Sequence, residues 1–265
     1  MFNRYKKKIS ESKLRCNFFR KKILELSQRV SALHIGGTFS STEIMDCIFN
    51  ILMKKDERNY FIMSKGHGSI LQYVILNFQG IISNKTLKNY SKSNGILGVH
   101  PEIKNKGINA STGALGHGLA MAAGFALSNR KKLVYVVLSD GELQEGSTWE
   151  AAMVISNLKL NNLVMIIDNN DFQSLERSSK SHPALYPIDK KFRAFGWDTK
   201  ICDGHNIKKI LKSILKRKKN KPFCLVAKTI KGYPISFMKN IPIWHYRSPS
   251  KLEYLKAIKE LSIKK

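Results

Sequence analysis

The stretch "VVLSDGELQEGSTWE", from Val136 to Glu150, decides the fold because a run of apolar residues ends abruptly in acids and glycines. A second run, "LVMIIDNND" from Leu163 to Asp171, repeats the change from apolar to polar. Short apolar runs rich in β-branched residues are typical of strands buried in a parallel sheet. We therefore expect two neighbouring strands whose last residues emerge at one edge of a sheet.

The segment between these two strands has the pattern of a helix. Ser147 and Glu150 fit a capping box, in which each side chain satisfies a free backbone N–H at the helix start. Apolar residues then recur at helical spacing as far as Leu158. A strand, a helix and a parallel strand form a right-handed crossover, which places Asp140 and Asn170 at the carboxyl edge of the sheet, where ligands bind in such folds.

The rest of the chain continues this alternation of strands and helices. Apolar, β-branched runs also occur at 60–64 and 222–230, and apolar residues recur at helical spacing over 10–33. The pattern predicts an α/β fold with three αβα layers around a mostly parallel sheet. With 265 residues, of which 43% are hydrophobic, we expect one domain over 1–265.

The formal net charge of +27 raises the hypothesis of a nucleic-acid-binding protein. The lysines are spread along the whole chain together with many Asn and Ile residues, as a compositionally biased genome would also produce. The one dense run, Lys212 to Lys221, ends a helical pattern and has no interleaved aromatic residues. We interpret it as a solvated helix end and expect no nucleic-acid partner.

Other classes of protein are disfavoured by the sequence. No apolar segment approaches the roughly 20 residues that a membrane-spanning helix needs, so we expect a cytoplasmic protein without a membrane partner. The four cysteines are widely separated and show no CxxC spacing. Neither a zinc site nor a disulfide framework is therefore expected.

The polar residues at the sheet edge suit a divalent cation. Mg²⁺ prefers oxygen ligands and is commonly shared between a carboxylate and phosphate groups. Asp140, Asn170 and a backbone carbonyl near Phe172 can supply three such oxygens, and Gly141 lets the backbone approach phosphates without a Cβ in the way. A plain turn is the alternative, because Asp and Asn favour loops.

The pair "SDG" and "DNND", with 27 residues between Gly141 and Asn169, resembles the thiamine diphosphate motif, in which glycine usually stands at the position of Ser139. Six further stretches resemble the N-terminal half of transketolase and occur in its order. They are "HIGGTFSSTEI" (34–44), "SKGHGSILQY" (64–73), "GVHPE" (98–102), "STGALGHGLAMAAGFAL" (111–127), "DGHN" (203–206) and "KGYPISFMKN…WHYRSP" (231–249). The similarity is greatest to the split form, in which this half is a separate polypeptide.

The resemblance implies roles for individual residues. Mg²⁺ would be bound by Asp140, Asn170 and the Phe172 carbonyl, and thiamine diphosphate by His67, Gly113, Leu115, Gly141, Asn170 and His245. Catalytic roles would fall to His34, His100 and His245, with Tyr246 as the alternative to His245 in the alignment. Glu145 would lie at a subunit interface, although its charge also suits the start of the following helix.

The resemblance also implies a partner. In transketolases the glutamate that activates thiamine diphosphate lies in a pyrimidine-binding domain, which we expect here, with the C-terminal domain, on a separate chain. A heterotetramer of the two chains would transfer a two-carbon ketol unit from a ketose phosphate such as xylulose 5-phosphate to an aldose phosphate such as ribose 5-phosphate. A subunit of another thiamine-dependent synthase, resembling deoxyxylulose phosphate synthase, is an alternative, and a basic nucleic-acid-binding protein on a decayed fold is a third.

Overall fold

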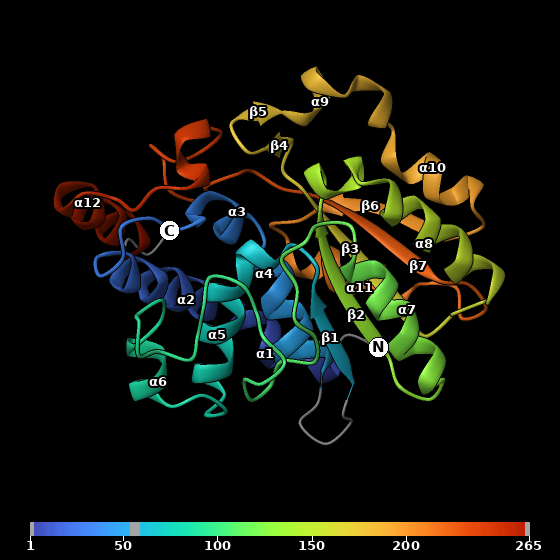
Figure 1. Ribbon diagram of the computed structural model, residues 1–265, viewed down its shortest axis with the longest axis horizontal. Coiled ribbons are helices and arrows are strands. Elements are labelled where there is room, and N and C mark those ends of the chain that lie inside the picture. The colour runs from blue at the N-terminus through green and yellow to red at the C-terminus, as the bar shows by residue number, and fades with distance from the viewer. Residues whose placement is uncertain (1–2, 54–58, 263–265) are drawn as a thin grey trace.

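A computed structural model describes residues 3–53 and 59–262. Its centre is a five-stranded sheet in the order β1 (Tyr60–Met63), β2 (Val134–Ser139), β3 (Leu163–Asn169), β7 (Phe223–Lys228) and β6 (Asp198–Asp203) (Figure 1). Every neighbouring pair in this sheet is parallel. A short antiparallel pair, β4 (Phe172–Gln173) and β5 (Glu176–Arg177), follows β3. The predicted α/β fold with a mostly parallel sheet is confirmed.

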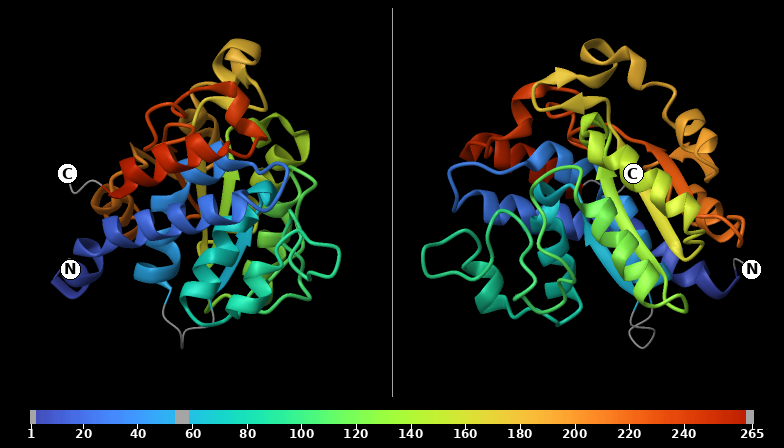
Figure 2. Two further views of the ribbon diagram at one scale, coloured as in Figure 1. Left: turned by 90° about the vertical axis from the view of Figure 1, so that its left-hand side faces the viewer. Right: turned by 45° about the vertical axis from the view of Figure 1, so that its right-hand side comes forward.

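Helices cover both faces of the sheet (Figures 1 and 2). One face packs against α7 (Gly118–Ser128), α8 (Gly146–Asn157) and α10 (Ile188–Ala194). The core on the other face is lined by α3 (Ile35–Ser40), α4 (Thr42–Asp46), the π-helical turn η2 (Cys47–Leu52), α5 (Ser69–Phe78) and α11 (Ile207–Leu215). Helix α2 (Ser12–Ser27) packs on α4 and α5, and α12 (Lys251–Ser262) packs on α2. Shorter helices are α1 (Lys6–Ser10), α6 (Asn84–Lys88), α9 (Ser178–Ser181), η1 (Asn3–Tyr5), η3 (Gly66–Gly68), η4 (Gly141–Gln144), η5 (Pro183–Leu185) and η6 (Pro242–His245).

Two apolar cores result from the alternation of side chains along the strands. Val137 and Ile166 point into the core beneath α2 to α5, whereas Val136 and Met165 point into the core beneath α7 and α8. All four side chains are fully buried. A strand that is covered on both faces has few positions left for polar residues, which explains why β2 and β3 read as continuous apolar runs.

The start of α8 differs from the prediction. The helix begins at Gly146 rather than after Ser147, and its N-cap is Glu145, whose side chain makes no capping hydrogen bond. A Cβ on Gly116 would lie 2.5 Å from the Ser147 hydroxyl oxygen, so this side chain is packed against the loop before α7. The predicted capping box of Ser147 and Glu150 is therefore wrong, because packing against a neighbouring loop decides where Ser147 lies.

Strand β6 is absent from the predicted strands, although it completes the sheet beside β7. Its sequence, "DTKICD", is polar, and Ile201 is 48% exposed.

All four cysteines are free thiols, as expected. Within the residues described, none of the helices combines the length and the apolarity needed to cross a lipid bilayer.

The central position of β3 gives a prediction for stability. Replacing Ile166, which is completely buried, by alanine should lower the free energy of unfolding by about 2–5 kcal/mol, because the substitution leaves a cavity between sheet and helices. The matched control is Ile201→Ala on the half-exposed edge strand, which should cost less than about 1 kcal/mol. Urea unfolding measures both values, and equal losses would contradict the assigned layers.

Candidate functional site

The ends of β2 and β3 meet as the sequence predicts. Ser139 is in register with Asp168, and the Asp140 carboxylate is placed directly against the loop that follows β3. Its Oδ2 accepts hydrogen bonds from the Asn169 side chain at 2.8 Å and from the Asp171 backbone N–H at 2.6 Å. Asn170 lies between these two donors in sequence. The structure therefore brings the two predicted polar segments together at the carboxyl edge of the sheet.

The Asp140 carboxylate is buried without an ion-pair partner among the described residues. It is fully buried, and burial raises its pKa to about 7, with a smaller contribution from the charge of Asp168. Hydrogen bonds from Asn169, Asp171 and Gly141 oppose this shift. No basic side chain in the described part of the chain forms an ion pair with Asp140. A divalent cation beside the carboxylate would lower the pKa, so this donor fits a metal ion.

Asn170 and Phe172 complete the predicted oxygen donors. The Asn170 amide oxygen accepts the Phe172 backbone N–H at 3.0 Å, while its NH₂ group donates toward Ser40 and Asp168. A Cβ on Gly141 would lie 3.5 Å from the Phe172 carbonyl oxygen and 3.0 Å from the Gln173 Cβ. A side chain at this position would force the loop at Gln173 to shift by a few tenths of an ångström, because the two loops approach closely. The described residues contain no group of three His, Cys, Asp or Glu side chains suited to a metal, so Asp140 is joined here by amide and carbonyl oxygens rather than by further carboxylates.

Three of the predicted histidines form a cluster. The ring centroid of His34 lies 5.2 Å from that of His67 and 5.2 Å from that of His245, and His67 and His245 are 6.1 Å apart. His34 comes from the start of α3, His67 from η3 after β1, and His245 from η6. Tyr246, the alternative to His245, also contacts His34, with ring centroids 4.5 Å apart. Both candidates for the aligned position therefore reach the cluster.

The clustered histidines are neutral at pH 7. Burial lowers the pKa of His34 to about 4, with smaller contributions from His100, Lys65 and Lys231. Burial and the nearby Lys231 lower the pKa of His245 to about 3, and burial places the pKa of His67 well below its usual range. The buried Nδ1 of His34 has no hydrogen-bond partner among the described residues. A neutral imidazole with a free nitrogen can accept a hydrogen bond from a ligand.

Of the remaining predicted residues, His100 lies near this cluster, because it interacts electrostatically with His34 and His67. Gly113 packs against the His100 ring, where a Cβ would lie 3.0 Å from Cγ, and its φ of +146° also favours glycine. Leu115 is half-buried in the same loop. Glu145 is exposed at the start of α8 and packs against Gly116. Among the described contacts, neither Leu115 nor Glu145 touches the clustered histidines.

Sequence reasoning missed three charged residues of the site. Lys65 and Asp168 form a completely buried ion pair at 2.6 Å between the ends of β1 and β3. The Lys231 ammonium donates to the Ser174 carbonyl at 2.7 Å and lies 3.3 Å from Nδ1 of His245. Burial and the charge of Lys65 lower the pKa of Lys231 to about 8. All three lie inside the stretches that resemble the thiamine diphosphate motif or transketolase: Lys65 in "SKGHGSILQY", Asp168 in "DNND" and Lys231 in "KGYPISFMKN". Their place in these motifs could have identified them.

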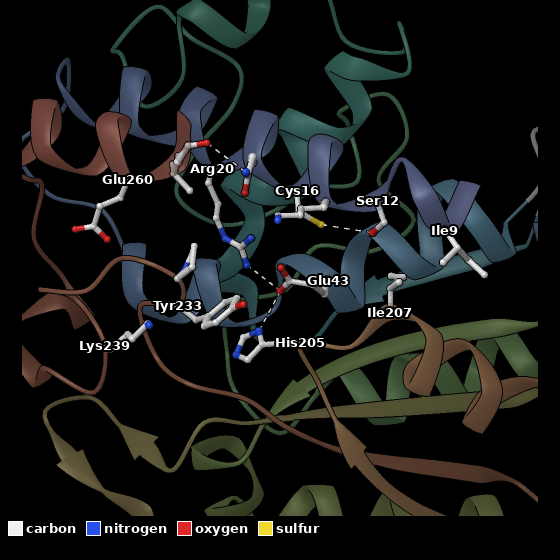
Figure 3. A pocket seen from close by; sticks show the side chains of 14 residues that line it. Ile9, Ser12, Cys16, Arg20, Glu43, His205, Ile207, Tyr233, Lys239 and Glu260 are labelled. Atoms are coloured by element: carbon white, nitrogen blue, oxygen red, sulfur yellow. Dashed lines mark hydrogen bonds and ion pairs between the residues drawn. The ribbon is translucent and has the colours of Figure 1, made fainter. Parts of the chain in front are cut away.

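A separate cavity of about 610 Å³ lies between α2, α12 and the segments after β6 and β7 (Figure 3). At its base, Glu43 Oε2 lies 2.8 Å from Arg20 Nη2 and 3.1 Å from His205 Nδ1. His205 Nε2 accepts the backbone N–H of Ile230 at 2.9 Å, so Nδ1 carries the proton. None of the predicted site residues lines this cavity. Its network instead holds the backbone that leads to Lys231.

Comparison with known proteins identifies the family. Residues 13–247 match the family model described as "Transketolase, thiamine diphosphate binding domain". The chain therefore belongs to the transketolase family and corresponds to its N-terminal, thiamine diphosphate-binding half.

Individual relatives agree with this assignment. The chain is 36% identical to an apulose-4-phosphate transketolase subunit of Actinobacillus succinogenes, covering 98% of this chain and 99% of that protein. It is 32% identical to the 6-deoxy-6-sulfo-D-fructose transketolase subunit SqwG of a Clostridium species, covering 92% and 94%. The solved transketolase of Campylobacter jejuni superposes with a TM-score of 0.90 at 25% identity, over 96% of this chain but 43% of that one. The chain thus spans less than half of that longer enzyme.

The lowered histidine pKa values predict a pH dependence of stability. Between pH 6.5 and pH 4, His34 and His245 bind protons in the unfolded chain but stay neutral in the folded protein. These histidines therefore make the folded state less stable as the pH falls. Asp140 and Glu142, whose pKa values burial raises to about 7, act in the opposite direction. The test therefore compares how the free energy of unfolding changes with pH in the wild type and in a histidine variant.

Replacing His245 by glutamine should make the free energy of unfolding fall less steeply, or rise more, from pH 6.5 to pH 4 than it does in the wild type. Urea unfolding at several pH values measures this slope. The exposed His182 supplies a matched control, His182→Gln. An unchanged slope in the His245 variant would show that this side chain is not held neutral by its surroundings.

Proposed function

We propose that this chain is the N-terminal subunit of a two-chain, thiamine diphosphate-dependent transketolase. The observation that supports this most directly is the meeting of two groups at one sheet edge. One is the buried Asp140 with the loop from Asn169 to Phe172, and the other is the cluster of neutral histidines. Lys231 links them, because it touches His245 and interacts electrostatically with Asp140.

The residues present fit Mg²⁺ and a diphosphate. In the proposal, Asp140, the Asn170 amide oxygen and the Phe172 carbonyl bind Mg²⁺, which prefers such hard oxygen ligands. Gly141 admits the diphosphate, and the ammonium of Lys231 supplies a positive charge close by. His67 and His245 would also contact the diphosphate, and Gly113 and Leu115 would pack against the thiamine rings.

When bound, thiamine diphosphate supplies the electron sink needed to cleave a carbon–carbon bond of a ketose. The protein's part is to orient the sugar and to move protons. His34, His100 and His245 are the proposed groups for this task. His34 and His245 are neutral at pH 7, so each ring can form hydrogen bonds with a donor hydroxyl. A bound ligand that raises the pKa of either ring toward 7 would make it an effective general base.

A partner chain completes the proposed enzyme. The relatives named as transketolase subunits have almost the same length as this chain, which supports a separate partner. We propose that the partner contributes the pyrimidine-binding domain with the catalytic glutamate, and that two copies of each chain assemble with Glu145 near an interface. Free thiols and a sugar-phosphate substrate suit a cytoplasmic enzyme.

The sugar donor is the least constrained part of the proposal. Xylulose 5-phosphate as donor and ribose 5-phosphate as acceptor follow from the similarity to transketolase. The relatives from Actinobacillus succinogenes and the Clostridium species are named for apulose 4-phosphate and 6-deoxy-6-sulfo-D-fructose. A test of substrate choice therefore compares all three ketoses as ketol donors.

The proposal predicts an activity that needs two chains. This chain, mixed with a candidate partner of roughly 300 residues, an ordinary domain size, should transfer a ketol unit in the presence of Mg²⁺ and thiamine diphosphate, and neither chain should do so alone. Replacing Asp140 by alanine should abolish Mg²⁺-dependent binding of the cofactor, measured by calorimetry on the mixed chains. Lack of transfer with every such partner, together with Mg²⁺-independent or absent cofactor binding, would refute the proposal.

A further inference from the structure

We propose that Ser40 is a positioning residue for the metal site, and that its hydroxyl fixes the orientation of the Asn170 amide. This inference rests on the proposed function, because it assigns a role beside the proposed Mg²⁺ ligands. Ser40 is the last residue of α3 and is fully buried. No motif argument singled it out, since the hydroxyl acts on residues about 130 positions later in the chain.

The direction of the Ser40 hydroxyl follows from its neighbours. Its Oγ lies 2.6 Å from Asp168 Oδ2 and 3.0 Å from the Gly37 carbonyl oxygen, and one hydroxyl proton serves one of them. The shorter, charge-assisted bond to the Asp168 carboxylate takes the proton. The lone pairs of Oγ are then available to the Asn170 NH₂ group, which lies 3.2 Å away.

Two acceptors therefore surround one end of the Asn170 side chain. Its Nδ2 lies 3.2 Å from Ser40 Oγ and 3.4 Å from Asp168 Oδ2. An amide turned by 180° would place its oxygen against these acceptors and would be repelled. The NH₂ end is therefore held at Ser40 and Asp168, and Oδ1 is directed to the Phe172 N–H.

The hydrogen bond that Asn170 donates to Ser40 Oγ is the shorter of the two contacts that hold the NH₂ end. At 3.4 Å, the Asn170 contact with Asp168 is long for an N–H···O hydrogen bond. The Asp168 carboxylate is also shared with Lys65 and with the Thr229 hydroxyl, which donates to Oδ1. Removing the Ser40 hydroxyl should leave the Lys65–Asp168 ion pair in place while loosening the amide. Ligand-orienting groups of this kind commonly contribute 10–100-fold to metal affinity.

The neighbouring serine is a matched control. Ser41 is also fully buried, but its Oγ donates to the Gly37 and Thr38 carbonyl oxygens of its own helix segment. Ser40→Ala and Ser41→Ala thus remove the same atoms from adjacent buried positions. A merely structural contribution should appear in both variants, whereas orientation of Asn170 should be affected only in the first.

The experiment measures the apparent Mg²⁺ dissociation constant at saturating thiamine diphosphate, by calorimetry on the chain mixed with its partner. We expect the constant to rise about tenfold in Ser40→Ala and to change less than twofold in Ser41→Ala. Thermal unfolding of both variants gives the structural comparison. If Ser40→Ala does not fold, Ser40→Cys, which fills the space but is a weak hydrogen-bonding group, replaces it with the same expectation.

Two negative results have different meanings. If the wild-type pair binds Mg²⁺ and cofactor and the Ser40 variant binds Mg²⁺ as tightly as the Ser41 variant, Ser40 does not position Asn170 and the inference is overturned. If the wild-type pair shows no Mg²⁺-dependent binding of thiamine diphosphate, the proposed function itself fails, and this inference fails with it.

Discussion

The ion pair between Lys65 and Asp168 is the interaction on which the arrangement of the sheet edge depends. Both side chains are completely buried, and their atoms lie 2.6 Å apart. Burying two charges is costly, and the attraction offsets the cost only when the remaining hydrogen-bonding groups are satisfied. Here Gly37, Ser40 and Thr229 satisfy them. The pair thereby connects the ends of β1 and β3 with α3 and with the segment after β7, which are four of the regions that supply the site.

The sequence predicted those parts of the fold that burial makes apolar. Burial makes four strands nearly continuous apolar runs, which is why the sequence predicted them: β1, β2, β3 and β7. The ends of β2 and β3 then gave the positions of Asp140 and Asn170. Strand β6 was not predicted because its side chains are half-exposed or exposed, and such positions tolerate Asp, Thr and Lys. Strand β1, at the opposite edge of the sheet, is mostly buried and keeps its apolar run. The start of α8 was misplaced because contact with Gly116, 31 positions from Ser147, outweighs the local capping pattern.

The site was predictable only in part, and for a different reason. His34, His67 and His245 were identified from resemblance to transketolase, since each histidine alone is as well explained by the core or the surface. Lys65 and Asp168 are 103 positions apart, and a lysine among 46 basic residues gives no sign that it will be buried. A buried charge becomes recognisable only when its partner is known, and that knowledge comes from the three-dimensional structure.

Two buried ionisable groups at the site, Asp140 and Lys231, have pKa values shifted in opposite directions, and one kind of ligand would stabilise the charge of both. Burial raises the pKa of Asp140 to about 7, whereas burial and Lys65 lower the pKa of Lys231 to about 8. In the described part of the chain neither group has an ion-pair partner within 4 Å. A simple cation would relieve only Asp140, and a simple anion only Lys231. Under the proposed function, a diphosphate carrying a divalent cation would bring both charges in one ligand, as an ordinary loop at a sheet edge would not need.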